Sequence, residues 1–523
     1  MTTDRLTESD RNAQLVYDWN EVNRKGRLTG KNVTFFDETL RDGLQNPSVL
    51  DPSIDDKLRI LHLMDDLGIQ VADIGLPGSS KRAFEDVLRM CREVADQRMK
   101  IKIACAGRTV VGDITPMVEI SQRAGIPVEV YAFIGSSPIR QYAENWDVAG
   151  IAKKSTEAID VAVKAGLSVA YVTEDTTRSR PEVLTTLFRA AIDHGATRLC
   201  LSDTVGHATP DGVRNLIHFT QSVIAGMGAK NIGIDWHGHN DRGLALENAL
   251  WALEYGADRV HGTALGIGER VGNAQMELIL LNMKLLGQLE GQDLTKLMEY
   301  CETVAKAVGW TVALNYPLVG RDAFRTATGV HAAAIIKAMA KGDAWLADRI
   351  YSGVPAGMFG RKQEICIGFM SGASNVNYYL RERGIEPDEA LTTEILGTRV
   401  HRVSGCNGWR DYALFGVDRR ARMARWQRVI PLPDRASADL ACPATAIALT
   451  PSSATRYGAS GCGRAEILEL QCTEIDCGWV GVAVAAPAPV VAPPAPLIVV
   501  PAITATVEVH ASDSGAALSA PRP

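Results

Sequence analysis

Two histidines spaced two residues apart form the most informative motif of the chain. His237 and His239 lie in the run His-Gly-His-Asn-Asp at 237–241, which follows residues 231–236, a segment with the pattern of a short buried strand. Residues two apart in a strand share a face, so both imidazoles would point the same way and could bind one metal ion. An isolated pair of this kind is more often structural, so a metal site requires further ligands.

Two other polar clusters also follow predicted strands. The first, residues 38–45, comes directly after a strand at 33–37 and contains Arg41 and Asp42. The second, residues 266–273, comes after a strand at 259–263 and ends in Asn273. Any one of these clusters could be a helix cap or a surface pair. Three polar clusters just past three strands indicate a functional site.

The chain from residue 31 to about 285 alternates short apolar strands with amphipathic helices. Eight strand–helix units of this length predict an α/β fold, the (β/α)8 or TIM barrel. A doubly wound sheet is the alternative, but it does not explain polar clusters after so many strands. The predicted strands lie near residues 33–37, 71–75, 101–105, 128–134, 168–173, 198–202, 232–237 and 259–263.

Barrel closure would bring the distant clusters together. All strands of a barrel end on one face, and closure makes strands seven, eight and one neighbours. Asp42, His237, His239 and Asn273 could then surround one point. Two imidazoles, a carboxylate and an amide oxygen suit Mg²⁺, Mn²⁺ or Zn²⁺, and the donor types do not choose among them.

The same face offers groups that would act on a bound substrate. An octahedral ion on these ligands keeps positions for a bidentate 2-oxo acid, whose ketone it would polarise. Arg41 could stabilise an enolate or oxyanion nearby, and Thr204 could donate a hydrogen bond to the substrate carboxylate. Glu174 and Asp175, after strand five, could bind substrate or orient Arg41 through a salt bridge, and we favour the salt bridge.

The rest of the chain divides into flanking segments. We expect an N-terminal extension at 1–30, the catalytic barrel at 31–289 and a small helical subdomain at 290–398, with a helix starting near His331. Residues 399–523 lack a clear period and become rich in Ala, Pro and Val at the end. This composition predicts an irregular tail, disordered or extended.

Composition limits the classes of partner. The 523 residues carry a net charge of −6, which gives no reason to expect nucleic acid or an anionic membrane. The N-terminus has no apolar signal-peptide core, and no stretch before residue 400 is apolar enough to span a bilayer. The ten cysteines form no Cys-x-x-Cys pair. Buried thiols in a reducing cytoplasm are therefore the expectation.

The motifs at 36–45, 237–241 and 266–273 closely resemble the signatures of the metal-dependent Claisen-condensing barrel enzymes. These are 2-isopropylmalate, citramalate and homocitrate synthase, and the wider group includes hydroxymethylglutaryl-CoA lyase. The resemblance covers roughly residues 30–395. It implies that the four residues above bind the divalent metal, that Arg41 is catalytic and that acetyl-CoA is the acyl donor. It also implies a homodimer in which His331 reaches the partner's site, and we include Glu174 and His331 in the catalytic set.

Smaller features sort the family members. Homocitrate synthases typically have Glu where this chain has Asp42, and the lyase carries a Cys in the loop that here spans 266–270. Both features favour the branch of 2-isopropylmalate and citramalate synthases. Within it we expect a 2-isopropylmalate synthase, with 2-oxoisovalerate as substrate in leucine biosynthesis, and citramalate or homocitrate synthase are the alternatives. Arg140 and His261 depart from the synthase pattern, which puts the substrate in doubt. Rival classes are a lyase, a metal-dependent hydrolase, whose His-x-His usually follows strand one, and a non-catalytic barrel.

Overall fold

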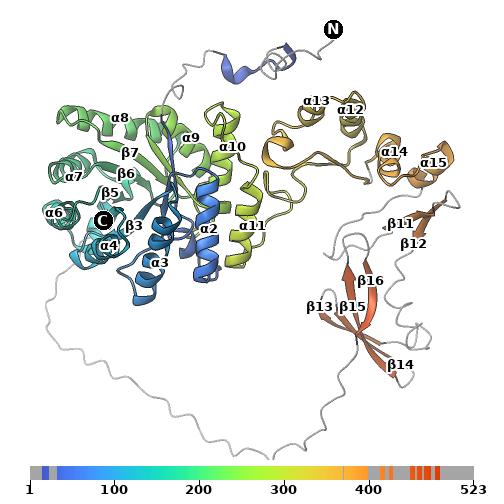
Figure 1. Cartoon of the computed structure of the whole chain (residues 1–523), viewed down its shortest axis with the longest axis horizontal. Helices are drawn as coiled ribbons and strands as arrows, with labels where there is room; N and C mark the ends of the chain where they lie inside the picture. Colours follow the sequence, from blue (N-terminus) through green and yellow to red (C-terminus); the bar gives the residue numbers. More distant parts are fainter. Residues whose placement is uncertain are drawn as a thin grey trace, which may run out of the picture. The chain divides into compact units, whose positions relative to one another are not determined.

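A closed barrel of eight parallel strands forms the centre of the computed structural model, which describes residues 14–22, 32–368, 370–397 and six strands between 413 and 482 (Figure 1). The strands pair in sequence order, and the last pairs with the first. The prediction of a (β/α)8 barrel is therefore confirmed. The strands are β1 (Thr34–Asp37), β2 (Val71–Asp73), β3 (Lys102–Arg108), β4 (Val128–Gly135), β5 (Val169–Glu174), β6 (Arg198–Asp203), β7 (Gly233–Gly238) and β8 (Arg259–Gly262).

Closure is fixed by the register of β1 against β8. Phe36 pairs with His261 and Asp37 with Gly262. Barrel strands are covered on both sides, so they are short, nearly continuous buried runs. The loops that follow β7, β8 and β1 therefore meet at one end of the barrel, as the three polar clusters require.

Helices form a ring around the barrel (Figure 1). Their ends follow from local sequence: Ser53 caps α2 by accepting a hydrogen bond from the Asp56 backbone, and Asp147 caps α6 in the same way. All of them except the short α5 bury apolar residues on one side. The helices are α2 (Ile54–Asp66), α3 (Lys81–Gln97), α4 (Val111–Ala124), α5 (Pro138–Glu144), α6 (Val148–Lys164), α7 (Pro181–Asp193), α8 (Pro210–Gly226), α9 (Ala245–Tyr255) and α10 (Met276–Leu285).

The barrel interior has one apolar part and one polar part. Phe36, Tyr131 and Cys200 pack together with small residues of the neighbouring strands. Buried Asp235, Arg259 and His261 lie on β7 and β8 of the same barrel. Their ion pairs and hydrogen bonds support the end of the barrel where the three clusters meet.

Residues 290–397 contain further helices and a two-stranded sheet. Helix α11 (Leu297–Val308) packs beside α2, and its Tyr300 belongs to the barrel's apolar core (Figure 1). A separate small core forms around Ala332 and Ile335. The other elements are β9 (Arg325–Thr326), α12 (Gly329–Ala340), α13 (Ala344–Arg349), β10 (Glu364–Ile365), α14 (Ala373–Arg381) and α15 (Glu389–Gly397).

The chain after Arg399 forms a second compact unit. Its described elements are a two-stranded and a four-stranded antiparallel sheet, where the sequence predicted an irregular segment. The end of the predicted tail, residues 483–523, lies outside the described residues. The strands are β11 (Ala413–Asp418), β12 (Met423–Gln427), β13 (Ala448–Ser453), β14 (Arg456–Gly461), β15 (Arg464–Cys472) and β16 (Cys477–Val482).

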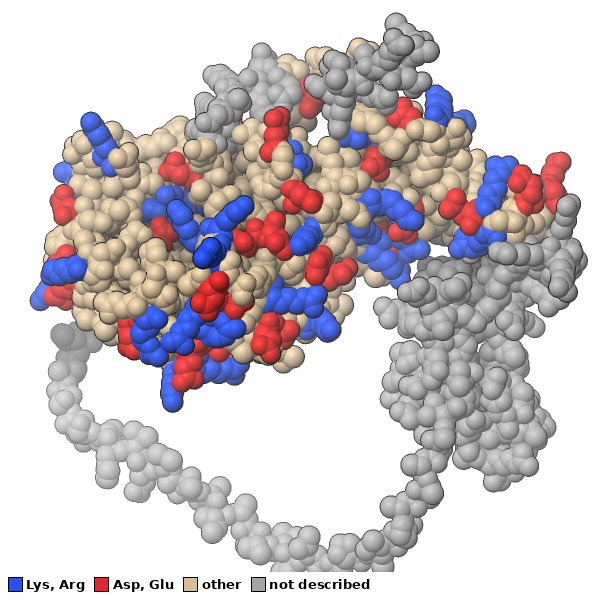
Figure 2. All heavy atoms as spheres, in the orientation of Figure 1, with Lys and Arg blue, Asp and Glu red and all other residues tan. Residues whose placement is uncertain are grey.

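The described part of the chain has no helix that is both long and apolar enough to cross a bilayer. Lys and Arg are interspersed with Asp and Glu on the face in Figure 2. Neither sign of charge forms a continuous field on the described part of this face.

Candidate metal centre

The predicted ligands meet at the carboxyl end of the barrel. Asp42, His237 and His239 are all buried, and each presents one potential ligand atom. These three atoms lie within 4.8 Å of one another. The Asn273 amide donates to the Asp42 carboxylate at 2.5 Å. The structure therefore brings together four residues that span most of the barrel sequence.

The glycines of the loop after β8 make room for Asn273. A Cβ at Gly268 would lie 1.9 Å from the Asn273 side-chain oxygen, and Gly272 has φ +90°, in the left-handed region. Asn273 itself donates its backbone N–H to the Gly266 carbonyl at 2.9 Å. Only a loop without side chains at these points can turn tightly enough to hold the amide against Asp42.

Two buried ligand atoms lack a protein partner. His239 Nδ1 and Asn273 Oδ1 make no hydrogen bond with any residue of the structure. A buried polar atom left unpaired costs about 1–3 kcal/mol, so such atoms are uncommon unless a ligand satisfies them. The Asn273 side chain contacts Asp42, so its free oxygen fits a divalent cation there, and His239 faces the same carboxylate through Nε2 at 3.6 Å.

The protonation states also suit a cation. Burial lowers the pKa of His237 and lowers that of His239 to about 4, so both imidazoles keep a free lone pair at neutral pH. Burial alone would raise the pKa of Asp42, but the Arg41 guanidinium and the hydrogen bond from Asn273 hold it well below its usual range. The set at neutral pH is thus two neutral imidazoles and one carboxylate.

Glu38 was given no role by the sequence analysis, yet it orients one ligand. Its carboxylate is fully buried and accepts from His237 Nδ1 at 2.7 Å and from His261 Nδ1 at 2.5 Å. A carboxylate only accepts, so His237 must carry its proton on Nδ1 and keep Nε2 free. This is the arrangement by which carboxylates fix metal-binding histidines.

A buried network continues beneath Glu38. His261 contacts Asp235 through Nε2 at 3.3 Å and stacks on the Phe36 ring. Asp235 in turn accepts from Tyr131 at 2.5 Å and from Arg198 at 2.6 Å. Asp235 could have been found from the sequence, because it lies two residues before His237 and shares its face of the strand.

Three carboxylates contact Arg41, and the predicted partners, Glu174 and Asp175, are not among them. The guanidinium contacts Glu38, Asp42 at 2.7 Å and Asp73 at 2.8 Å. The expected salt bridge to Glu174 or Asp175 is therefore wrong. Strand β2, which ends in Asp73, lies next to β1 in the barrel, whereas β5 does not.

Glu174 and Asp175 have other partners. Glu174 lies 3.7 Å from Arg140, and burial raises the pKa of its carboxyl group. Asp175 pairs with Arg178 at 2.7 Å, and its backbone N–H donates to Thr204 Oγ1 at 2.8 Å. The Thr204 hydroxyl accepts that bond and so keeps its own proton to donate.

His331 stands apart from this set in the single chain. It is exposed in the first turn of α12, and its ring stacks on Tyr351 with 4.0 Å between centroids. Among the described residues it contacts no member of the metal set. The predicted helix start at this position is confirmed.

Fold and site together define a (β/α)8 barrel with a buried nitrogen–oxygen metal centre at its carboxyl end. Residues 32–304 match the family described as HMGL-like, and the chain belongs to that family. A 2-isopropylmalate synthase of Sulfolobus acidocaldarius is 32% identical over 71% of this chain and 90% of its own length. A homocitrate synthase of Methanopyrus kandleri is 31% identical over 70% of this chain and 86% of its own length. The HMG-CoA lyase structure from Bacillus subtilis is 23% identical, with a TM-score of 0.46, over 54% of this chain and 95% of its own.

Proposed function

We propose that this protein is a 2-isopropylmalate synthase-like acyltransferase that condenses acetyl-CoA with 2-oxoisovalerate. The observation that carries the proposal is the convergence of buried Asp42, His237 and His239, whose ligand atoms lie within 4.8 Å of one another. The Asn273 side chain contacts Asp42 and leaves its own Oδ1 unpartnered. A 2-oxo acid chelates a cation through its ketone and carboxylate oxygens. Mg²⁺, Mn²⁺ or Zn²⁺ held by Asp42, His237, His239 and Asn273 would polarise that ketone as a Lewis acid.

We assign charge stabilisation, substrate binding and proton transfer to side chains of the barrel. Arg41, fixed in orientation by three carboxylates, lies at the metal set and supplies positive charge to an enolate oxygen. Thr204 donates its hydroxyl proton to the substrate carboxylate. Glu174, whose pKa is raised by burial and whose side chain is partly exposed, is the group that we assign to take and return a proton.

The domain organisation belongs to the same proposal. Residues 31–289 carry the chemistry, and the subdomain at 290–398 lends His331 to the barrel of a second copy in a cytoplasmic homodimer. The exposed position of His331, away from its own metal set, suits action on a neighbouring subunit. We expect the tail from 399 to be dispensable for this site, so truncation after Thr398 should leave condensation intact and insensitive to leucine.

Substrate choice is tested by release of CoA thiol with a panel of 2-oxo acids. We expect 2-oxoisovalerate to exceed pyruvate, although a methylene or two in an apolar pocket gives only about 1–3 kcal/mol of discrimination. A preference for 2-oxoglutarate would make the protein a homocitrate synthase. Cleavage of hydroxymethylglutaryl-CoA without condensation would make it a lyase, and no thiol release with any acid would leave a non-catalytic barrel.

The shared site is tested by subunit mixing. His331→Ala and His237→Ala homodimers are each expected to be inactive. If each site combines one barrel with the other subunit's His331, half of the sites in a mixed dimer are intact, so random mixing should restore about a quarter of wild-type activity. Absence of any recovery in mixed dimers would refute the sharing of His331.

A further inference from the structure

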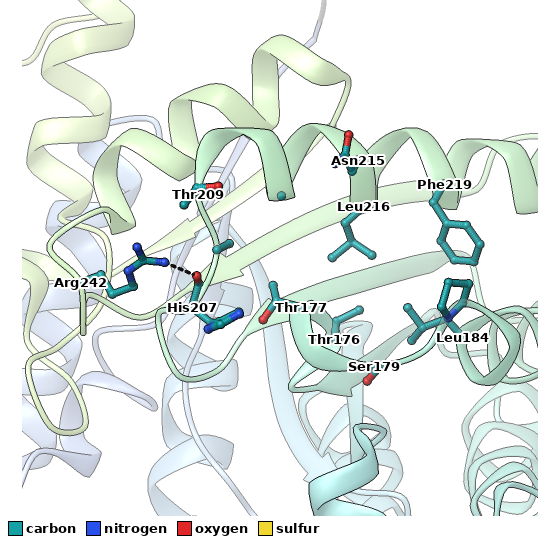
Figure 3. A pocket seen from close by; sticks show the side chains of 13 residues that line it. Thr176, Thr177, Ser179, Leu184, His207, Thr209, Asn215, Leu216, Phe219 and Arg242 are labelled. Carbon is teal, nitrogen blue, oxygen red and sulfur yellow. Dashed lines mark hydrogen bonds between the residues drawn. The ribbon is translucent and has the colours of Figure 1, made fainter.

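A cavity of about 440 Å³ lies beside the metal centre, on the same end of the barrel. Its walls come from the segments that follow β5, β6 and β7, and its volume is in the range of small-molecule sites (Figure 3). The mechanism proposed above assigns nothing to this cavity. The lining residues that matter below are Thr177, Leu184, His207, Thr209, Phe219 and Arg242.

The two ends of the cavity differ in chemistry. Figure 3 shows Arg242, His207 and Thr209 gathered at one end, and Leu184 and Phe219 at the other. Leu184 is buried and Phe219 half-buried, so this end is an apolar slot between α7 and α8. None of the residues that line the cavity is Asp or Glu.

The polar end has donors without an acidic partner. Arg242 donates one N–H to the His207 carbonyl at 2.8 Å and forms no ion pair with any described residue. Helix α8 begins at the same end, and its N-cap residue Thr209 makes no side-chain capping bond. Asp211 in the first turn of α8 pairs with Arg214 at 2.8 Å and does not line the cavity. A guanidinium and an uncapped helix N-terminus together favour a negatively charged group.

We propose that this cavity binds an organic anion with an apolar segment. Its carboxylate or phosphate lies against Arg242 and Thr209, and its apolar segment lies between Leu184 and Phe219. This chemistry has two sources, the pantetheine phosphate portion of an acyl-CoA or a separate small carboxylate. The proposal concerns binding alone and does not rest on the condensing activity.

One buried residue links the cavity wall to the metal centre. The Asp203 side chain accepts from Thr177 Oγ1 at 2.9 Å and from the His207 backbone at 2.8 Å. The Asp203 carbonyl accepts from the His239 backbone at 3.1 Å. A ligand that shifts Thr177 or His207 therefore acts on a residue hydrogen-bonded to a metal-binding histidine.

Gly212 provides a variant that fills the cavity. A Cβ at this lining position meets only Ala208 and Thr209, at 3.8 and 4.0 Å, which is ordinary contact. Gly212→Leu should therefore fold and project into the cavity. Gly226→Leu, at the other end of α8, is the matched control because its Cβ has no atom within 4 Å and the position does not line the cavity.

The test is calorimetric titration of the full chain with hexanoate and with its neutral analogue hexanamide. Hexanoate should bind wild type and Gly226→Leu alike, and more tightly than hexanamide does. Its affinity should fall about tenfold or more in Gly212→Leu, whose side chain occupies the space of the apolar segment, and in Arg242→Gln, which loses the charged hydrogen bond. The proposal is overturned if hexanoate fails to bind wild type, or binds both cavity variants as tightly as wild type.

Coenzyme A distinguishes the two sources. If CoA displaces hexanoate and itself binds more weakly to Gly212→Leu, the natural occupant is part of the acyl-CoA. If CoA and hexanoate bind together, the occupant is a separate small anion. Both results support the site, and neither requires turnover, so failure of the proposed condensation would be seen separately.

Discussion

Replacing Glu38 by Gln is the sharpest test of how the metal centre is held. The carboxylate is fully buried and accepts hydrogen bonds from two imidazoles and from Arg41. Gln has the same shape but only one acceptor oxygen, so its NH₂ group must face a donor whichever way the amide is turned. Either Arg41 or a histidine then loses its partner.

The size of the effect follows from these contacts. Loss of a carboxylate that orients a metal-binding His typically weakens metal binding by about 10- to 100-fold. The unpaired donor should also destabilise the protein by about 1–3 kcal/mol. Arg41 keeps Asp42 and Asp73, at 2.7 and 2.8 Å, so the fold itself should survive.

Calorimetric titration with Mn²⁺ measures the loss of metal affinity, urea unfolding measures the loss of stability, and CoA thiol release reports turnover. Glu299→Gln is the control, because Glu299 makes an exposed pair with Arg59 at 3.2 Å whose loss should change little. If Glu38→Gln bound Mn²⁺ within twofold of wild type and turned over normally, Glu38 would not be what orients His237.

Three further substitutions have distinct expected outcomes. Arg41→Lys keeps the charge but not the planar fork that reaches three carboxylates, so kcat should fall at least tenfold while Mn²⁺ still binds. Gly268→Ala should weaken Mn²⁺ binding about tenfold or more, because its Cβ would displace the Asn273 oxygen. Glu277→Gln should remove a pH dependence of stability: burial raises the pKa of Glu277 from 4.5 to about 7, so the folded state binds the proton more tightly and wild-type stability falls as pH rises from about 4.5 to 7. The fall due to this group is about 3 kcal/mol, measured by urea unfolding of both proteins.

Each of these expectations has a result that contradicts it. Loss of Mn²⁺ binding in Arg41→Lys would mean that Arg41 holds the ligands rather than serving the reaction. Gly112→Ala, where a Cβ meets no atom within 4 Å, is the control for Gly268→Ala, and equal Mn²⁺ affinity in the two would refute the steric argument. A stability difference between wild type and Glu277→Gln that does not change with pH would show that Glu277 titrates normally.

The barrel was predictable because buried parallel strands are nearly continuous apolar runs. The predicted strand at 128–134, for example, is Val128–Gly135 in the structure. The strands after Arg399 were missed for an equally local reason. In Arg464–Cys472 the alternation of polar and apolar residues changes phase between Ile467 and Leu468, so no single face reads as apolar.

The convergence of the four candidate metal ligands was predictable from the sequence, and the contacts that support them were not. Asp42, His237, His239 and Asn273 follow from strand ends and from a closed barrel, both visible in the sequence. The partners of Arg41 depend on which strands are neighbours and how far side chains reach across the barrel. Such contacts leave no periodic pattern in the sequence, so the supporting roles of Glu38 and His261 are seen only in the structure.

Closure of β8 on β1 gives a bound cation a part in folding. Asp42 comes from just after the first strand and Asn273 from just after the last, so a chain still being synthesised cannot complete the set until residue 273 has emerged. A cation that binds only the closed ring stabilises it by RT ln(1 + [M]/Kd), about 2.7 kcal/mol at one hundred times Kd. A cation held by Asp42 and Asn273 would therefore stabilise the closed ring, and its free concentration would set the size of that stabilisation.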